Sequence, residues 1–120
     1  MSDSIPDLHW RPSAADPEEY AKVSHDFSGV HLDDSLARAE GLPGVILHGM
    51  HVLGHVVSHL DRYAQPGRLT SVTVRFLDVT LPEEGVSVRM KPTDEHNVIF
   101  DAMQGDRQVL GEGLASFSKD

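Results

Sequence analysis

The sequence predicts an α+β fold in which a curled antiparallel sheet wraps around one long helix. Apolar residues recur at helical spacing from about residue 48 to residue 64, and they alternate with polar residues in several segments between 72 and 118. The helical segments precede the strand segments, which is the order typical of α+β domains. A sheet that faces one long apolar helix buries that helix by curling around it.

The length predicts one domain. A chain of 120 residues buries roughly two thirds of the surface that its unfolded form exposes, which suffices for a small core. Residues 1–15 are polar and carry two prolines. We expect them to form an N-terminal segment that is partly disordered or contributes a short edge strand at 7–10. Residues 16–120 are expected to form the domain itself.

Two short helices are expected before the long one. Asp16 suits an N-cap and Pro17 the first helical position, so a helix is predicted to start there. Residues 26–29 interrupt the pattern, and a second helix over 33–40 is closed by Gly41. The long helix is expected to bury an apolar face made of Met50, Leu53, Val56, Val57 and Leu60.

The second half of the chain predicts four strands in a meander. Period-two alternation or β-rich composition marks each strand, and segments rich in Pro, Gly, Asp and Asn separate them. The expected strands are 72–77, 86–90, 98–103 and 107–118, with turns at 82–85, 94–97 and 104–106.

The composition excludes several classes of protein. With 19 acidic and 10 basic residues the net charge is −9, and no Lys/Arg cluster indicates a nucleic-acid binder. No cysteine is present, so disulfides and thiolate metal sites are excluded, and the chain fits a reducing compartment. No signal peptide is evident at the start, and four histidines interrupt the apolar stretch 45–60. A cytoplasmic protein without a membrane span is expected.

One motif carries the chemistry. Asp26 and His31 lie five residues apart, and a His-Gly-Met triplet at 48–50 opens the long helix. These features resemble the MaoC-like (R)-specific enoyl-thioester hydratases and dehydratases, a branch of the hot-dog fold. The family motif runs Tyr-Ala-x-x-Ser-Gly-Asp-x-Asn-Pro-Ile-His-x-Asp and continues to Ile-Ala-His-Gly-Met. This chain has YAKVSHDFSGVHLD over 20–33 and VILHGM over 45–50, and the resemblance covers about residues 16–118.

The resemblance implies a single hot-dog domain and a hydro-lyase of fatty acid or polyketide metabolism. Such an enzyme adds water to trans-2-enoyl thioesters of coenzyme A or acyl carrier protein, or removes it from (R)-3-hydroxyacyl thioesters. Asp26 and His31 would be its acid–base pair, because one group must deprotonate water and a proton must reach the α-carbon. The Gly49 N–H, at a positive helix end, would bind the thioester oxygen. No cofactor is implied, since the thioester itself is the electron sink.

Three positions depart from the family motif. His25 replaces a glycine, Ser28 an asparagine and Gly29 a proline. Ser28 can still donate a hydrogen bond, although its reach is shorter, and Gly29 removes a φ constraint from the loop. His25 places a second titratable group beside the aspartate. We expect the pocket to include His25, Ser28, His48 and Met50.

Other interpretations remain open. Asp26 could be an ordinary turn residue, His31 a structural histidine and Gly49 a tight packing position. A hot-dog thioesterase would use its carboxylate at the thioester carbonyl instead. The altered loop also suits a non-catalytic acyl-thioester-binding subunit of a heteromeric dehydratase. The resemblance implies a homodimer whose sheets join edge to edge, or a heterodimer with a related subunit.

Four histidines share one face of the long helix. His48, His51, His55 and His59 are spaced 3, 4 and 4 residues apart. Histidines four residues apart on a helix can bind zinc, but no glutamate completes the metalloprotease pattern. We favour a polar face at a subunit contact or along the approach to the active site, without a metal. Low pH would charge these histidines together.

Overall fold

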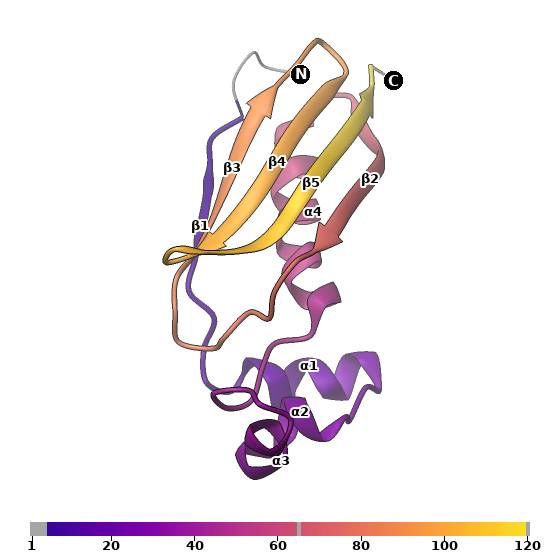
Figure 1. The fold of residues 1–120 in the computed structure, drawn as a ribbon. Helices are drawn as coiled ribbons and strands as arrows, with labels where there is room; N and C mark the ends of the chain where they lie inside the picture. The colour runs from indigo at the N-terminus through magenta and orange to yellow at the C-terminus, as the bar shows by residue number, and fades with distance from the viewer. Residues whose placement is uncertain (1–4, 65, 120) are drawn as a thin grey trace.

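The computed structural model describes residues 5–64 and 66–119. Within them, five strands form one antiparallel sheet in the order β1-β3-β4-β5-β2. The long helix α4 (Gly49–Ala64) runs along one face of this sheet (Figure 1). The predicted α+β fold, a curled sheet around a central helix, is confirmed. The strands are β1 (Leu8–Trp10), β2 (Arg68–Phe76), β3 (Val86–Pro92), β4 (Asn97–Gln104) and β5 (Arg107–Ser118).

Three short helices gather at one end of the sheet: α1 (Asp16–Ser24), α2 (Gly29–Leu32) and α3 (Asp34–Ala39) (Figure 1). The single turn of α2 was not predicted, because four residues are too few to show a helical period. Asp16 is the first helical residue and not the N-cap of α1. Its carboxylate accepts hydrogen bonds from the N–H and hydroxyl of Ser13, so it closes the preceding turn.

The core lies between α4 and the sheet. Val52, Val56 and Leu60 are each at most 1% exposed and pack against strand residues such as Val88. The predicted buried face was right for Val56 and Leu60, which are buried, and wrong for Met50, which is 62% exposed. Apolar residues occupy more than one side of α4, so their spacing does not identify the row that meets the sheet. Across the described residues, no helix has the length and apolarity needed to cross a membrane.

One buried side chain holds the connection between β2 and β3. Gln104, at the end of β4, is 1% exposed. Its amide nitrogen donates to the carbonyls of Leu81 (2.7 Å) and Glu84 (2.9 Å), and its amide oxygen accepts from the N–H of Leu81 (2.8 Å). Arg107 donates to the same amide oxygen and to the carbonyl of Val79. The end of the β4–β5 hairpin therefore fixes a loop that forms one wall of the site described below.

We predict that Gln104→Leu lowers the free energy of unfolding by about 1–3 kcal/mol, because it leaves buried polar groups of the loop without hydrogen-bond partners. Urea denaturation measures the change. Gln108→Leu is the matched control, since Gln108 is exposed and its amide donates only to the carbonyl of Leu110. Equal stability of the two variants would contradict this role for Gln104.

Candidate active site

The loop that carries Asp26 begins with a turn at His25. This residue ends α1 in the left-handed conformation, with φ 62° and ψ 19°, and its N–H donates to the carbonyl of Ala21 at 2.8 Å. Glycine adopts this conformation freely, whereas other residues are strained in it. His25 therefore stands, at a cost in strain, where the family motif has glycine, and the turn it makes leads directly into Asp26.

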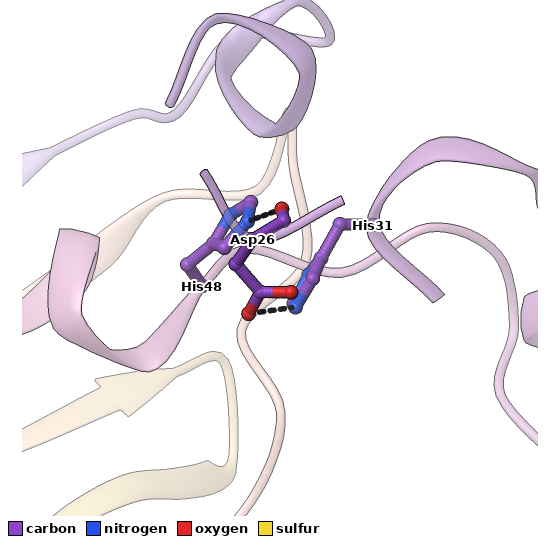
Figure 2. A group of neighbouring side chains, drawn as sticks. All are labelled: Asp26, His31 and His48. Atoms are coloured by element: carbon purple, nitrogen blue, oxygen red, sulfur yellow. Dashed lines mark hydrogen bonds and ion pairs between the residues drawn. The ribbon is translucent and has the colours of Figure 1, made fainter. Parts of the chain in front are cut away.

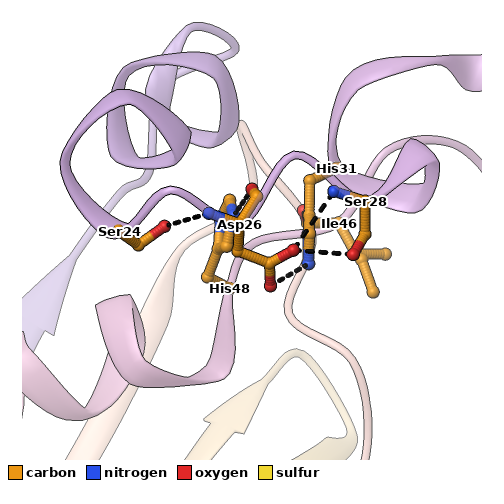
Figure 3. Close-up of polar contacts among 6 residues, drawn as sticks. All are labelled: Ser24, Asp26, Ser28, His31, Ile46 and His48. Atoms are coloured by element: carbon orange, nitrogen blue, oxygen red, sulfur yellow. Dashed lines mark hydrogen bonds and ion pairs between the residues drawn. The ribbon is translucent and has the colours of Figure 1, made fainter.

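The Asp26 carboxylate is fixed by Ser28. The Ser28 hydroxyl donates to Oδ1 at 2.6 Å and the Ser28 N–H donates to the same oxygen at 3.1 Å (Figure 3). These hydrogen bonds, first from the hydroxyl and then from the backbone, lower the pKa of Asp26 below its ordinary value. Asp26 is thus a carboxylate at neutral pH, and Ser28 reaches it despite being shorter than asparagine.

His31, on α2, faces the free oxygen of that carboxylate. Its Nδ1 lies 2.8 Å from the carbonyl oxygen of Ile46, which can only accept, so Nδ1 carries a hydrogen. In the neutral ring Nε2 is then an acceptor, 3.7 Å from Oδ2 of Asp26 (Figure 2). Two acceptors at this separation do not bond directly. The pair thus presents two acceptors to a small molecule with two O–H donors, such as water.

His48 packs against the ring of His31. It is 4% exposed, its Nε2 lies 2.9 Å from the carbonyl oxygen of Asp26, and its ring stacks on the His31 ring with centroids 3.7 Å apart and planes 16° apart (Figure 2). His48 does not line the cavity that opens beside His31. The structure therefore places His48, an expected pocket residue, in contact with both members of the pair.

A cavity of about 470 Å³ opens beside His31 and the start of α4. As the first residue of α4, Gly49 has an N–H without a partner inside the helix. The ring of Phe76 packs over it: a Cβ built on Gly49 would lie 3.0 Å from Cε1 of that ring. Gly49 thus combines tight packing against Phe76 with an exposed position in the first turn of the helix. The cavity is lined by His31, Ile46, Leu47, Gly49, Phe76, Leu77, Asp78, Val79 and Thr80.

The structure brings Asp26, His31, Ser28, His48 and Gly49 together, but leaves two candidates outside. The His25 side chain is exposed and its ring tilts against Phe27, and Met50 is absent from the cavity lining. The sequence does not indicate the carbonyl of Ile46 or the wall formed by Phe76 and residues 77–80. A backbone carbonyl leaves no signal in a sequence, and the wall comes from a connection with no motif.

The cluster also offers ligand atoms to a metal ion. Within residues 5–64 and 66–119, Asp26, His31 and His48 place one such atom each within 4.8 Å of one another. However, Nδ1 of His31 and Nε2 of His48 already bond to carbonyls. Imidazole lone pairs lie in the ring planes, and these two planes are nearly parallel, so their lone pairs do not converge on one ion. The arrangement fits an acid–base pair better than a metal centre.

The histidine face of α4 packs against α1 and β1. The ring of Trp10 stacks on His55 at 3.8 Å, and the ring of Tyr20 stacks on His51 at 4.6 Å. Further along, Nε2 of His59 lies 2.6 Å from the carbonyl oxygen of Pro6. Burial lowers the pKa of His51 and of His55, and nearby Asp16 partly offsets the shift. His51, His55 and His59 thus pack within the chain, while His48, at the start of the same face, contacts Asp26 and His31. A subunit contact on the partly exposed side of this face stays a prediction.

A larger hollow of about 630 Å³ lies over β3, β4 and β5. Its charged groups Arg89 and Asp101 are joined by two hydrogen bonds of 2.8 and 2.9 Å. Neither Asp26 nor His31 belongs to its lining. Size alone therefore does not mark the functional cavity, and the smaller one beside His31 is the candidate active site.

A family model described as MaoC like domain matches residues 6–110. The chain belongs to the MaoC-like dehydratase family. Members of this family are hydro-lyases. A fatty acid synthase beta subunit, pkiC, of Emericella nidulans is 32% identical over 93 residues, which are 75% of this chain and 5% of that protein. The peroxisomal hydratase-dehydrogenase-epimerase of Saccharomyces cerevisiae is 31% identical over 90 residues, or 74% of this chain and 10% of that protein.

Solved structures agree on the fold. A MaoC-like dehydratase from Phytophthora capsici superposes with a TM-score of 0.84 at 24% identity, covering 100% of this chain and 44% of that one. The (R)-hydratase from A. caviae gives 0.81 at 18% identity over 96% and 93% of the two chains. The ChsH1-ChsH2 complex from Mycobacterium tuberculosis gives 0.76 at 16% identity over 94% and 91%. The expected resemblance and the hot-dog fold are both confirmed.

The buried histidines predict a pH-dependent stability. Because the pKa of His51 and of His55 is lower in the folded protein than the ordinary 6.5, the unfolded chain binds more protons as the pH falls below that value. The free energy of unfolding should therefore be highest above about pH 6.5 and should decrease toward pH 5. Urea titrations across this range measure it.

Replacing both His51 and His55 by phenylalanine should flatten the curve, whereas His96→Ala, at an exposed position, should leave its slope unchanged. A wild-type curve that is flat between about pH 5 and 7 would contradict the prediction.

The turn at His25 predicts a gain in stability. His25→Gly should stabilise the protein by about 1 kcal/mol, because glycine removes the left-handed strain. Thermal unfolding measures the gain. Glu83→Gly is the matched control, since Glu83 has φ 67° in a turn away from the site and should gain similarly. A loss of stability in His25→Gly would show that its side chain contributes more than the strain costs.

Proposed function

We propose that this protein hydrates trans-2-enoyl thioesters to (R)-3-hydroxyacyl thioesters and catalyses the reverse dehydration, without a cofactor. The observation that carries the proposal is the pair of facing acceptors, Nε2 of His31 and Oδ2 of Asp26, 3.7 Å apart. His31 also lines a cavity that contains the first residue of α4. The acceptor pair would hold the nucleophile, and the cavity beside it would hold the thioester.

The pair is suited to activate one water molecule. Water donating to both acceptors would be held with its oxygen free to attack C3 of the enoyl group. As the C3–O bond forms, Nε2 of His31 accepts a proton, and the resulting imidazolium is stabilised by the Asp26 carboxylate. Because Ser28 lowers the pKa of Asp26, that carboxylate keeps its charge. The His31 imidazolium then returns this proton to C2, where the electron pair of the enolate forms the C–H bond. The hydroxyl and one hydrogen of a single water are thus added with no net oxidation or reduction.

The start of α4 suits the other half of the reaction. Negative charge develops on the thioester oxygen while C2 carries the electron pair, and the Gly49 N–H at the positive end of the helix dipole would stabilise it. Phe76 and Leu77, about half exposed, offer apolar surface for the acyl chain in the same cavity. We propose that coenzyme A or an acyl carrier protein supplies the thioester, as part of fatty acid or polyketide metabolism.

We further propose that the active protein is a dimer. Strand β2 is an edge of the sheet, and an unpaired edge is a ready template for a second strand. A second copy joined there would be a homodimer. The ChsH1-ChsH2 complex supports the alternative of a heterodimer with a related subunit.

Crotonyl-CoA distinguishes this function from its rivals. A hydratase removes the enone absorbance and releases no thiol, whereas a thioesterase releases free coenzyme A. A non-catalytic subunit binds the thioester but turns it over only after a second subunit is added. Free thiol that appears in step with the loss of the enone absorbance would overturn the proposal, because hydrolysis of the thioester also removes that absorbance.

The pair itself is tested by Asp26→Asn and His31→Ala. Each should lower the rate of hydration by about 10²–10⁴ while the circular dichroism spectrum stays native, because each removes one general acid–base group. Asp106→Asn and His96→Ala are matched controls at exposed turn positions and should keep the wild-type rate. Turnover near the wild-type rate in either site variant would sink the assignment.

A further inference from the structure

We propose that His48 is a positioning residue of the acid–base pair, holding Asp26 through its Nε2–H and His31 through the face of its ring. This inference rests on the proposed function. Among the polar side chains of the site, His48 contacts both members of the pair without lining the cavity. Because its side chain is 4% exposed whereas Asp26 is exposed, His48 acts through Asp26 and His31 and not on the substrate.

The first contact anchors the loop. Residues 24–28 are all exposed, so little packing holds the backbone that carries Asp26. His48 is 4% exposed and its Nε2 lies 2.9 Å from the Asp26 carbonyl oxygen. A carbonyl only accepts, so Nε2 must carry the hydrogen. A buried donor thus ties an exposed loop to the start of α4 (Figure 3).

The second contact restricts the His31 ring. The hydrogen bond from Nδ1 to the Ile46 carbonyl fixes one edge of that ring, but a ring held at one edge can still tilt. The His48 ring lies against its face, with centroids 3.7 Å apart. Together the two contacts aim Nε2 of His31 at Asp26, and a misplacement of about 1 Å in such a pair costs about a hundredfold in rate.

His48 is itself held in place. The ring of Tyr20 lies at 4.9 Å from its ring, tilted by 55°, and its carbonyl oxygen accepts from the N–H groups of His51 and Val52 in the first turn of α4. Its Nδ1 is buried and has no hydrogen-bond partner within residues 5–64 and 66–119. A bare lone pair costs less there than an unpaired N–H, which agrees with a hydrogen on Nε2.

The tautomer is tested without any turnover. Long-range ¹H–¹⁵N NMR on the ¹⁵N-labelled protein distinguishes a protonated from an unprotonated imidazole nitrogen. We expect Nε2 of His48 and Nδ1 of His31 to carry hydrogens. An unprotonated Nε2 on His48 overturns the proposal whether or not the protein is a hydratase, because the bond to Asp26 would then not exist.

Two substitutions separate the two contacts. His48→Phe keeps a ring to stack on His31 and loses the donor, whereas His48→Gln keeps an N–H at the position of Nε2. His48→Phe should lower kcat for crotonyl-CoA hydration by about ten- to hundredfold, with KM changed by less than about threefold. His48→Gln should recover only the part of the rate that depends on the donor, because it lacks the ring that stacks on His31. The matched control is His51→Phe, one turn further along α4, whose ring contacts Trp10, Tyr20 and His55; it should keep the wild-type kcat.

The outcomes are distinct. A raised KM with unchanged kcat in His48→Phe would mean that His48 binds substrate and does not position the pair. Equal losses in His48→Phe and His51→Phe would mean a general structural role for the histidine face. Either result overturns the inference while leaving the proposed function intact. An inactive wild-type protein with the expected tautomers would instead count against the proposed function alone.

Discussion

The burial of one row of α4 against the sheet is the constraint on which the other features depend. Val52, Val56 and Leu60 are almost fully buried, and burying side chains of this size contributes about 1.5–3 kcal/mol each. Once this row faces the sheet, the rotation of the helix is set. The histidine face must then meet α1 and β1, and the first residue of the helix must open into the cavity beside Phe76.

Hydrogen-bond complementarity then fixes the chemistry of the site. Two backbone carbonyls, of Ile46 and Asp26, accept from the two imidazoles, and each therefore dictates which ring nitrogen holds a hydrogen. The Nε2 atom of His31 faces a carboxylate whose own protonation is opposed by Ser28. Neither side chain is unusual alone. The acid–base role that we propose for them depends on two backbone carbonyls and on the hydroxyl and N–H of Ser28.

At the turn before Asp26, this chain has His25 where the family motif has glycine. A residue other than glycine at φ 62° is strained, yet the chain still turns into Asp26, and Ser28 still reaches the carboxylate. In this chain the turn and the hydrogen bonds to the carboxylate are thus made by residues other than those of the family motif. Strain of this kind is tolerated where the surrounding contacts over-determine the conformation, and here the buried His48 supplies one of those contacts.

The sequence by itself determined the class of fold, the order of its elements and the segment that carries Asp26 and His31. Periodicity reports which residues are apolar, and a motif reports which residue types recur at a spacing. Neither reports direction in space. Only the tertiary structure decided that Val52 and not Met50 faces the sheet, that His48 lies beneath the pair, and that the wall of the cavity comes from the β2–β3 connection. Those outcomes depend on contacts between segments far apart in the chain, and a local pattern carries no information about them.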